Sequence, residues 1–421
     1  MLKKFKVATL GCRTNQYESQ AYISQLQACG YTQAGEGEEA DICIVNSCTV
    51  TETADHSSRQ IIRQLKKQNP AAQIVVTGCA AEKDPKSFAA IPGVTQVVSN
   101  KDKEQLLPLV FPEKSWPEFS ITQFEAHTRA FVKVQDGCNS FCTYCIIPYV
   151  RGRSRSRSVR EILDEVRVLV QKGFKEIVLT GINIGDFDGN PDPGEPPVRL
   201  STLVRLVDAV EGVERLRISS IDPDEVDDEL LDAVLSGRST CPSFHIVLQS
   251  GSNVVLKRMN RKYTSQIFLD TVERLQKARS DFTFTTDVIV GFPGETEGDF
   301  EETLAILRQV RFAKVHMFPY SKREKTRAAL YPNQIAHEVI QVRKRKVLEV
   351  AEETAFLLRE TYVGKHAQLL LEHREEGESL FFGHTENFLP VFVEGGSLSS
   401  NQIVKVALIE NSPKGLKGRI L

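Results

Sequence analysis

The chain has 421 residues and a formal net charge of −2, and 41% of its residues are hydrophobic. This length predicts two or three domains, each with enough apolar residues to bury a core. No apolar run is long enough to cross a bilayer and the start is too short for a signal peptide, so we expect a cytoplasmic protein without membrane contact. The near-neutral charge excludes a global basic field, and any nucleic-acid binding must depend on local patches.

The first part of the chain alternates short apolar runs with helical patterns. This alternation predicts a doubly wound parallel sheet with helices on both faces. The pattern stops at a segment rich in proline and bulky residues, so we place the first domain at residues 1–113 and a linker at 114–127. The expected strands are Phe5–Leu10, Asp41–Val45, Gln73–Thr77 and Thr95–Ser99, and the expected helices include Gln16–Cys29 and Ala54–Gln68.

The alternation resumes over residues 128–358 as six strand–helix units. Six units in series predict a partial (β/α)6 barrel rather than the eight-fold form. A charged helical pattern, Ile335–Thr361, ends this domain. The expected strands are Phe131–Gln135, Glu176–Thr180, Arg215–Ser219, Phe244–Gln249, Phe284–Gly291 and Lys314–Phe318, and the helices are Val159–Lys172, Leu203–Val210, Glu229–Leu235, Ser265–Ala278 and Glu297–Val310.

Residues 359–421 differ in character from the rest of the chain. Short β-like runs are separated there by Gly, Glu and Asn, which predicts a small all-β barrel. The runs are Ala367–Leu371, Phe381–His384, Leu389–Val393 and Ile403–Ile409.

Three cysteines lie in one short loop after the first barrel strand. Cys138, Cys142 and Cys145 form a C-x₃-C-x₂-C pattern, at the end of a barrel where active sites form. Thiolates hold iron–sulfur clusters, and three of them leave the fourth iron of a cubane open to a cofactor. A structural zinc site is the alternative, but no fourth ligand follows at the usual spacing. The loop resembles the signature of the radical S-adenosylmethionine (SAM) superfamily.

Three further cysteines lie at strand ends in the first domain. Cys12, Cys48 and Cys79 each follow an expected strand and precede a helix. In a parallel sheet these ends share the edge where ligands bind, so the three thiols can form a second metal site. The alternative is three strand ends that contain cysteine without a metal. The other three cysteines are expected to be small core residues: Cys29, Cys43 and Cys241.

Small and polar residues follow the other barrel strands. Glycine lets the backbone approach a ligand, and short polar side chains can bind ribose and amino-acid groups. Each segment alone is equally consistent with a simple turn, but successive strand ends of this kind favour a cofactor-binding face. The candidates are Gly181, Asn183, Ser220 and Gln249.

Together, the strand-end cysteines, the cluster loop and the small β domain resemble the radical SAM methylthiotransferases over essentially the whole chain. The resemblance implies that Cys138, Cys142 and Cys145 bind a radical-generating [4Fe-4S] cluster and SAM, with Tyr144 against the adenine. It implies an RNA-binding TRAM domain at the C-terminus. It also implies an auxiliary [4Fe-4S] cluster with three ligands, Cys12, Cys48 and Cys79.

The sequence around Cys12 indicates which subgroup of this family the chain resembles. The stretch TLGCRTNQYES at Thr9–Ser19 is similar to the MtaB-type enzymes, which act on N6-threonylcarbamoyladenosine (t6A) at position 37 of tRNA. Enzymes that act on isopentenyladenosine (MiaB-type) more often show Gln-Met after that cysteine, and those that act on a ribosomal protein (RimO-type) show Pro-Lys. The resemblance therefore implies methylthio transfer to C2 of t6A. One SAM donates the methyl group, another supplies the radical, and flavodoxin or ferredoxin supplies electrons.

A run of arginines follows the cluster loop. Most such runs are solvated surface loops, but the position of this one beside the radical site favours phosphate contacts with the anticodon stem-loop of tRNA. In the C-terminal domain, Phe388 and His384 are consistent either with stacking on bases or with barrel core. The arginines are Arg151, Arg153, Arg155 and Arg157.

Two other classes of protein fit the sequence less well. A cobalamin-binding radical enzyme needs an Asp-x-His-x-x-Gly motif, and the nearest match, Asp55-His56-Ser57-Ser58, has its histidine in the wrong place. A non-catalytic RNA-binding iron–sulfur protein is the second alternative, but it has no evident use for a cluster with an open iron.

Overall fold

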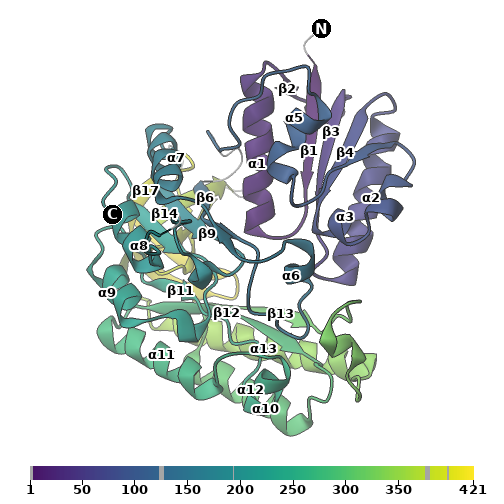
Figure 1. The fold of residues 1–421 in the computed structure, drawn as a ribbon. Coiled ribbons are helices and arrows are strands. Elements are labelled where there is room, and N and C mark those ends of the chain that lie inside the picture. The colour runs from purple at the N-terminus through teal and green to yellow at the C-terminus, as the bar shows by residue number, and fades with distance from the viewer. Residues whose placement is uncertain (1–2, 123–127, 193, 375–379, 396–397) are drawn as a thin grey trace.

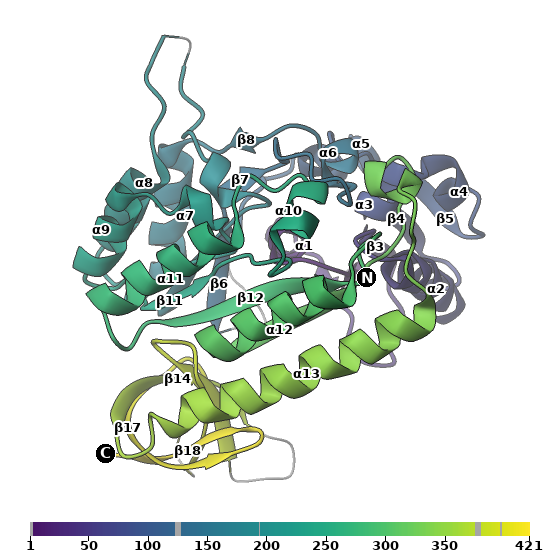
Figure 2. The same ribbon diagram turned by 90° about the horizontal axis from the view of Figure 1, so that it is seen from below.

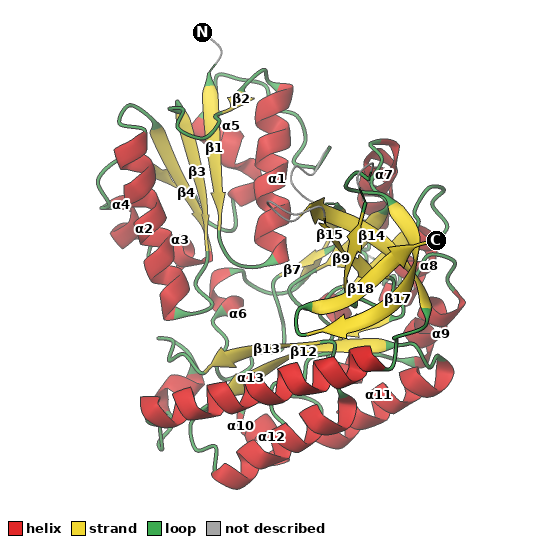
Figure 3. Ribbon diagram, turned by 180° about the vertical axis from the view of Figure 1, so that it is seen from behind, coloured by secondary structure: helices red, strands yellow, loops and turns green. Residues whose placement is uncertain are grey.

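The computed structural model describes residues 3–122, 128–192, 194–374, 380–395 and 398–421. It confirms the expected architecture of an N-terminal parallel sheet, a partial barrel and a small closed β-barrel (Figure 1). The N-terminal sheet stands beside the partial barrel, and the small barrel lies behind it, as Figure 3 shows from the opposite side. No helix in the described ranges is long and apolar enough to span a membrane.

The N-terminal sheet is parallel, with strand order β2-β1-β3-β4-β5. Alternate residues of β3 enter two separate cores: Cys43 packs with α2 and α3, and Ile44 packs with α1 and α5. Helices therefore cover both faces, as a doubly wound sheet requires. The elements are β1 (Lys4–Thr9), α1 (Arg13–Ala28), β2 (Thr32–Gln33), β3 (Ile42–Ser47), α2 (Glu52–Gln68), β4 (Gln73–Gly78), α3 (Cys79–Lys83), α4 (Pro85–Ala89), β5 (Val94–Val97) and α5 (Leu106–Val110), with a 3₁₀ turn at Lys103–Gln105.

The partial barrel keeps its six long strands in chain order. Two three-stranded parallel sheets, β6-β9-β10 and β11-β12-β13, are joined by bridges such as Leu216–Thr240 and Ile221–Ile246. The strands are β6 (Arg129–Lys133), β9 (Glu176–Thr180), β10 (Arg215–Ile218), β11 (Ser243–His245), β12 (Thr283–Val290) and β13 (Lys314–Pro319). The long helices are α7 (Val159–Gln171), α8 (Leu200–Asp208), α9 (Asp228–Ser236), α11 (Ser265–Ala278) and α12 (Glu297–Val310).

Short elements connect these units and correct two expectations. The strand expected at Phe244–Gln249 ends at His245, and Gln249 takes a left-handed φ of 60° and only a single bridge to Val288. Part of the arginine run pairs as a strand with the residues just before the cysteine loop. The short elements are β7 (Gln135–Asp136), α6 (Ile147–Val150), β8 (Arg155–Ser156) and α10 (Asn253–Arg258), with 3₁₀ turns at Ile184–Asp186, Pro223–Glu225 and Arg327–Leu330.

The helix α13 (His337–Glu360) runs from the partial barrel to the small β-barrel (Figure 2). That barrel closes in the order β14-β15-β16-β18-β17. Its last strand was not expected, because two glycines in GLKGRI remove the apolar alternation that marks a strand. The strands are β14 (His366–Arg374), β15 (Leu380–Thr385), β16 (Pro390–Glu394), β17 (Ile403–Ser412) and β18 (Gly415–Ile420).

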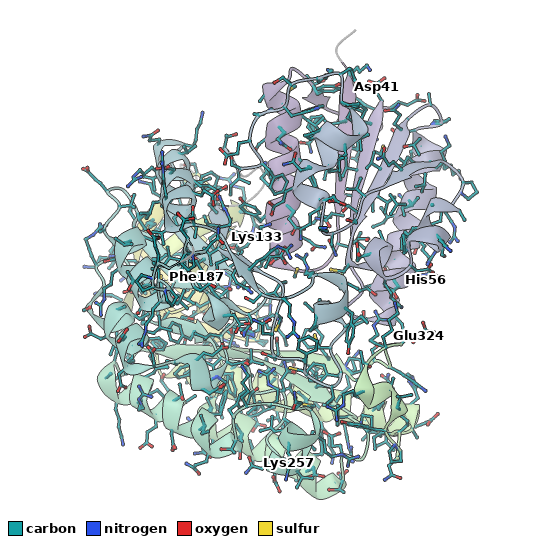
Figure 4. All side chains as sticks on the ribbon, in the orientation of Figure 1. Asp41, His56, Lys133, Phe187, Lys257 and Glu324 are labelled. Atoms are coloured by element: carbon teal, nitrogen blue, oxygen red, sulfur yellow. The ribbon has the colours of Figure 1, made fainter. Side chains whose placement is uncertain are left out.

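The three units are packed together by specific contacts. Figure 4 shows Lys133 where the partial barrel meets α1, and Phe119 of the expected linker packs on Tyr17 and Tyr22 of α1. Arg215 of β10 donates hydrogen bonds to the small barrel, at the carbonyls of His384 (3.0 Å) and Gln368 (2.7 Å). Residues 123–127 of the expected linker lie outside the described residues.

Candidate active site

The structure brings Cys12, Cys48 and Cys79 to one edge of the N-terminal sheet, where the neighbouring strands β1, β3 and β4 end. Gly11, before Cys12, has a φ of 93°, and a Cβ there would lie 2.6 Å from the Sγ of Cys48. Gly78, before Cys79, has a φ of 94°, and a Cβ there would collide with the Ser47 carbonyl. Glycine at both positions therefore permits the close approach of these strand ends.

The surroundings of these thiols do not favour bare thiolates. Burial raises the pKa of Cys48 to about 11, and the charges of Cys79 and Cys12 add to the effect. Burial also raises the pKa of Cys79, which the nearby charge of Arg151 opposes. A group of thiolates here needs additional positive charge, which a metal cluster supplies.

The donor set fits an iron–sulfur cluster better than a single metal ion. All of the cysteines in the structure are free thiols. Across the described residues, no three His, Cys, Asp or Glu side chains converge on one ion, as a zinc site requires. A cubane binds each thiolate through a different iron, so its ligands surround a larger volume.

The second cysteine loop, between β7 and α6, is built in a similar way. Gly137, before Cys138, has a φ of 71° and lies against the Arg153 backbone. The Ser140 amide donates to the Sγ of Cys138 (3.4 Å), and Nη1 of Arg261 donates to the Sγ of Cys142 (3.0 Å). Burial, followed by the charge of Cys142, raises the pKa of Cys145. Hydrogen bonds to the sulfurs and a low exposure are features that tune iron–sulfur sites.

A cavity of about 680 Å³ lies where the three units meet. Cys12 and Arg13 line it from the N-terminal domain, and residues in and after the strands of the partial barrel also line it. His384 and Phe388 of the small barrel line it as well, with their rings stacked at a centroid distance of 4.4 Å. These two side chains therefore face a cavity, which keeps the stacking interpretation open and excludes a role in the small barrel's core alone.

The expected cofactor residues divide between two cavities. Gly181 and Ser220 line the large one, and Tyr144 and Gln249 line a second one of about 170 Å³. The two cavities share Asp287 and Phe318. The Oε1 atom of Gln249 is buried without a hydrogen-bond partner, so it can accept a hydrogen bond from a bound cofactor.

Two of these residues have structural contacts of their own. The side-chain amide of Asn183 donates to Oε1 of Glu225 (2.9 Å), and Asn183 lines neither of the two cavities. A Cβ at Gly181 would lie 2.8 Å from Oε1 of Gln135, which accepts hydrogen bonds from the next two backbone amides. In this structure the Asn183 side chain therefore contacts Glu225 and faces neither cavity.

The arginine run is not the uniform surface patch that the sequence suggested. Arg151 is fully buried and donates to Glu18 (3.1 Å) and Asp136 (2.8 Å), so its guanidinium cannot reach an RNA phosphate, and that expectation is wrong. Arg157 is held by Glu165 (2.6 Å). Arg153 is exposed over the ring of Phe141, and Arg155 is half exposed, so the RNA contact stays a prediction for these two.

Several residues of the site escaped the sequence analysis. Glu18 and Lys103 are fully buried and form an ion pair of 2.5 Å beside Asp136. Their partners are far apart in the sequence, so no local spacing marks them. Asp136 and Arg261 carried a weak signal, because the first precedes the Gly137-Cys138 pair and the second lies in the basic stretch after α10.

Two family models match stretches of this chain. The model of the radical SAM superfamily matches residues 132–307, and that of the uncharacterised protein family UPF0004 matches residues 4–99. The threonylcarbamoyladenosine tRNA methylthiotransferase MtaB of Chlamydia pneumoniae is 47% identical, over 99% of this chain and 98% of that protein. MtaB of Bacillus subtilis (strain 168) is 38% identical, over 96% and 93%. A tRNA-2-methylthio-N(6)-dimethylallyladenosine synthase of Clostridium novyi is 33% identical, over 100% and 97%.

Solved structures share the fold at low sequence identity. The radical SAM methyltransferase TsrM from Kitasatospora setae has a TM-score of 0.57 and 14% identity, over 78% of this chain and 77% of that one. The cobalamin-dependent SAM radical enzyme OxsB has a TM-score of 0.51 and 14% identity, over 85% and 58%. These likenesses concern the fold alone.

Proposed function

Because the chain belongs to the radical SAM methylthiotransferases, we propose that it transfers a methylthio group to C2 of t6A at position 37 of tRNA. The two MtaB relatives are 47% and 38% identical, against 33% for the dimethylallyladenosine synthase, which supports this substrate. The observation that carries the proposal is the large cavity, because it joins an auxiliary thiol, the barrel mouth and the small β-barrel.

The cysteines would hold two [4Fe-4S] clusters, with Cys138, Cys142 and Cys145 at one and Cys12, Cys48 and Cys79 at the other. When bound, these clusters supply the reductive cleavage of SAM and a site for the transferred sulfur.

The protein's own residues position the reactants. Tyr144 and the free acceptor of Gln249 bind the cofactor in the second cavity, and Arg261 holds the Cys142 sulfur. The stacked pair His384–Phe388 forms one wall of the larger cavity and limits water there. Asp287 lies at the boundary between the two cavities, where cofactor and substrate meet.

The substrate is the anticodon stem-loop of tRNA in the cytoplasm, and flavodoxin or ferredoxin delivers the electrons. A loop base is already unpaired, so it can enter the cavity without melting of a duplex. Arg153 and Arg155 contact phosphates beside the cluster loop.

Mass spectrometry of tRNA nucleosides from a deletion strain tests this function. We expect the 2-methylthio derivative of t6A to disappear and to return on complementation, while the methylthio derivative of isopentenyladenosine stays constant. The reverse pattern would identify the MiaB-type activity instead. The reconstituted protein should also form 5′-deoxyadenosine from SAM under anaerobic reduction. Failure to do so would exclude a radical SAM enzyme activity.

A further inference from the structure

Arg13 has no carboxylate partner among the residues that the structure describes. Its guanidinium lies in the large cavity, 5.7 Å from the ring centre of Phe131, and no hydrogen bond or ion pair joins it to a carboxylate of the described residues. Arg129, a second guanidinium, lines the same cavity. A partly buried guanidinium among like charges is costly until an anion binds it.

Two other arginines near this cavity already have carboxylate partners. Arg129 pairs with Glu372 (2.7 Å), and Arg217 pairs with Glu176 (2.7 Å). His245 lies 3.3 Å from Asp287. Among the lysines and arginines that line the cavity, within the described residues, Arg13 and the exposed Lys314 have no carboxylate partner.

The proposed substrate carries a negative charge that can pair with Arg13. The N6 substituent of t6A ends in the carboxylate of threonine, whereas an isopentenyl group is wholly apolar. A guanidinium binds a carboxylate through two parallel hydrogen bonds. Arg13 directly follows Cys12, so a substituent anchored on Arg13 keeps the base beside the strand end that carries that thiol.

We propose that Arg13 binds the threonyl carboxylate of t6A, with Lys314 as a second cation, and so selects this base against adenosines with an apolar N6 group. The inference rests on the proposed function and adds to it the residues that determine specificity. The two residues reach the cavity from different units, since Arg13 begins α1 and Lys314 begins β13.

Single variants assayed on two substrates test whether Arg13 and Lys314 bind the threonyl carboxylate. The variants R13Q and K314Q are assayed on two anticodon stem-loop RNAs, one with t6A and one in which the threonyl carboxylate is a neutral carboxamide. We expect R13Q to lower kcat/KM on t6A RNA about a hundredfold, mainly through KM, and K314Q to lower it about tenfold. On the carboxamide RNA the wild type should already be slow, and neither variant should lose much more. R160Q, at an exposed arginine of α7, should match the wild type on both.

Two readouts separate this role from damage to the neighbouring cluster. Iron content, the visible absorption and SAM cleavage should be unchanged in R13Q. If R13Q loses iron, the kinetics of K314Q on the two RNAs test the inference instead. Equal use of the two RNAs by the wild type overturns the inference while the proposed function stands. Equal losses on both RNAs in each variant also overturn it. If the wild type modifies no t6A RNA, the proposed function itself fails.

Discussion

Arg151 donates a hydrogen bond from Nε to the Sγ of Cys79, at 3.3 Å, and so links the two cysteine sites. Arg151 follows the loop of Cys138, whereas Cys79 belongs to the N-terminal sheet. The same guanidinium binds Glu18 and Asp136, and Asp136 stands immediately before the Gly137-Cys138 pair. One buried cation therefore holds the domains in register and lies beside an auxiliary thiol.

Replacing Arg151 by alanine should destabilise the protein and reduce its iron content. The change leaves Glu18 and Asp136 buried with one partner fewer, which costs about 3 kcal/mol, and removes the positive charge beside Cys79. Chemical denaturation and iron analysis measure the two effects. R153A, which alters an exposed guanidinium of the same run, is the control. Equal behaviour of the two variants would contradict the structural role of Arg151.

Gly78 should tolerate alanine less well than Gly30. Both have a left-handed φ, 94° and 80°, so each variant incurs a backbone penalty of about 1 kcal/mol. A Cβ at Gly78 also meets the Ser47 backbone, whereas a Cβ at Gly30 has nothing within 4 Å. We expect G78A to lose auxiliary iron and several degrees of melting temperature, and G30A to keep its iron. The interpretation is wrong if both variants retain full iron.

The cysteines should sort into ligands and core residues by iron content. Alanine at Cys12, Cys48 or Cys79 should remove about half of the iron, because each cubane holds the same number of irons. The matched control is alanine at Cys43, a thiol buried in the middle of β3 and away from the sheet edge. Iron loss in C43A that equals the loss in C48A would refute the assignment.

Glu225 should make stability depend on pH. Burial, and then the charge of Asp222, raises the pKa of Glu225 to about 7, from its ordinary value of 4.5. The folded state therefore binds more protons than the unfolded state between these values, so this group's contribution to stability falls as pH rises through that window. We expect E225Q to be more stable than the wild type at pH 8 and similar to it at pH 5, by thermal denaturation. A constant difference between the two proteins at both pH values argues against this titration.

Arg153 and Arg155 should contribute to tRNA binding through phosphates alone. Each alanine variant should weaken binding about equally for different tRNA sequences and reduce the slope of log K against log salt by about 1. Titrations at several salt concentrations measure this slope, with R160A as the surface control. An unchanged slope in both variants would show that Arg153 and Arg155 do not contact RNA phosphates.

Much of the fold could be read from local sequence. The strand at Glu176–Thr180 and the helices at Ser265–Ala278 and Glu297–Val310 have the expected bounds, because their periodicity and capping are local properties. β3 continues past Val45 by pairing with β4, and buried Asn46 donates to the Asn15 carbonyl (3.1 Å), contacts that an apolar pattern cannot reveal. The strand β18 forms only because β16 and β17 are present to pair with it.

The sequence by itself determined the chemistry that the chain can carry, because the C-x₃-C-x₂-C spacing is local. The thiols of Cys12, Cys48 and Cys79 follow strands whose order is implied by their alternation with helices. Only the tertiary structure decided which charges are used internally. It buried Arg151 against Glu18 and left Arg13 without a carboxylate partner in the described part of the chain, although both are arginines close to a cluster cysteine. Such partners come from distant parts of the chain, and packing alone sets which charges are neutralised before a substrate arrives.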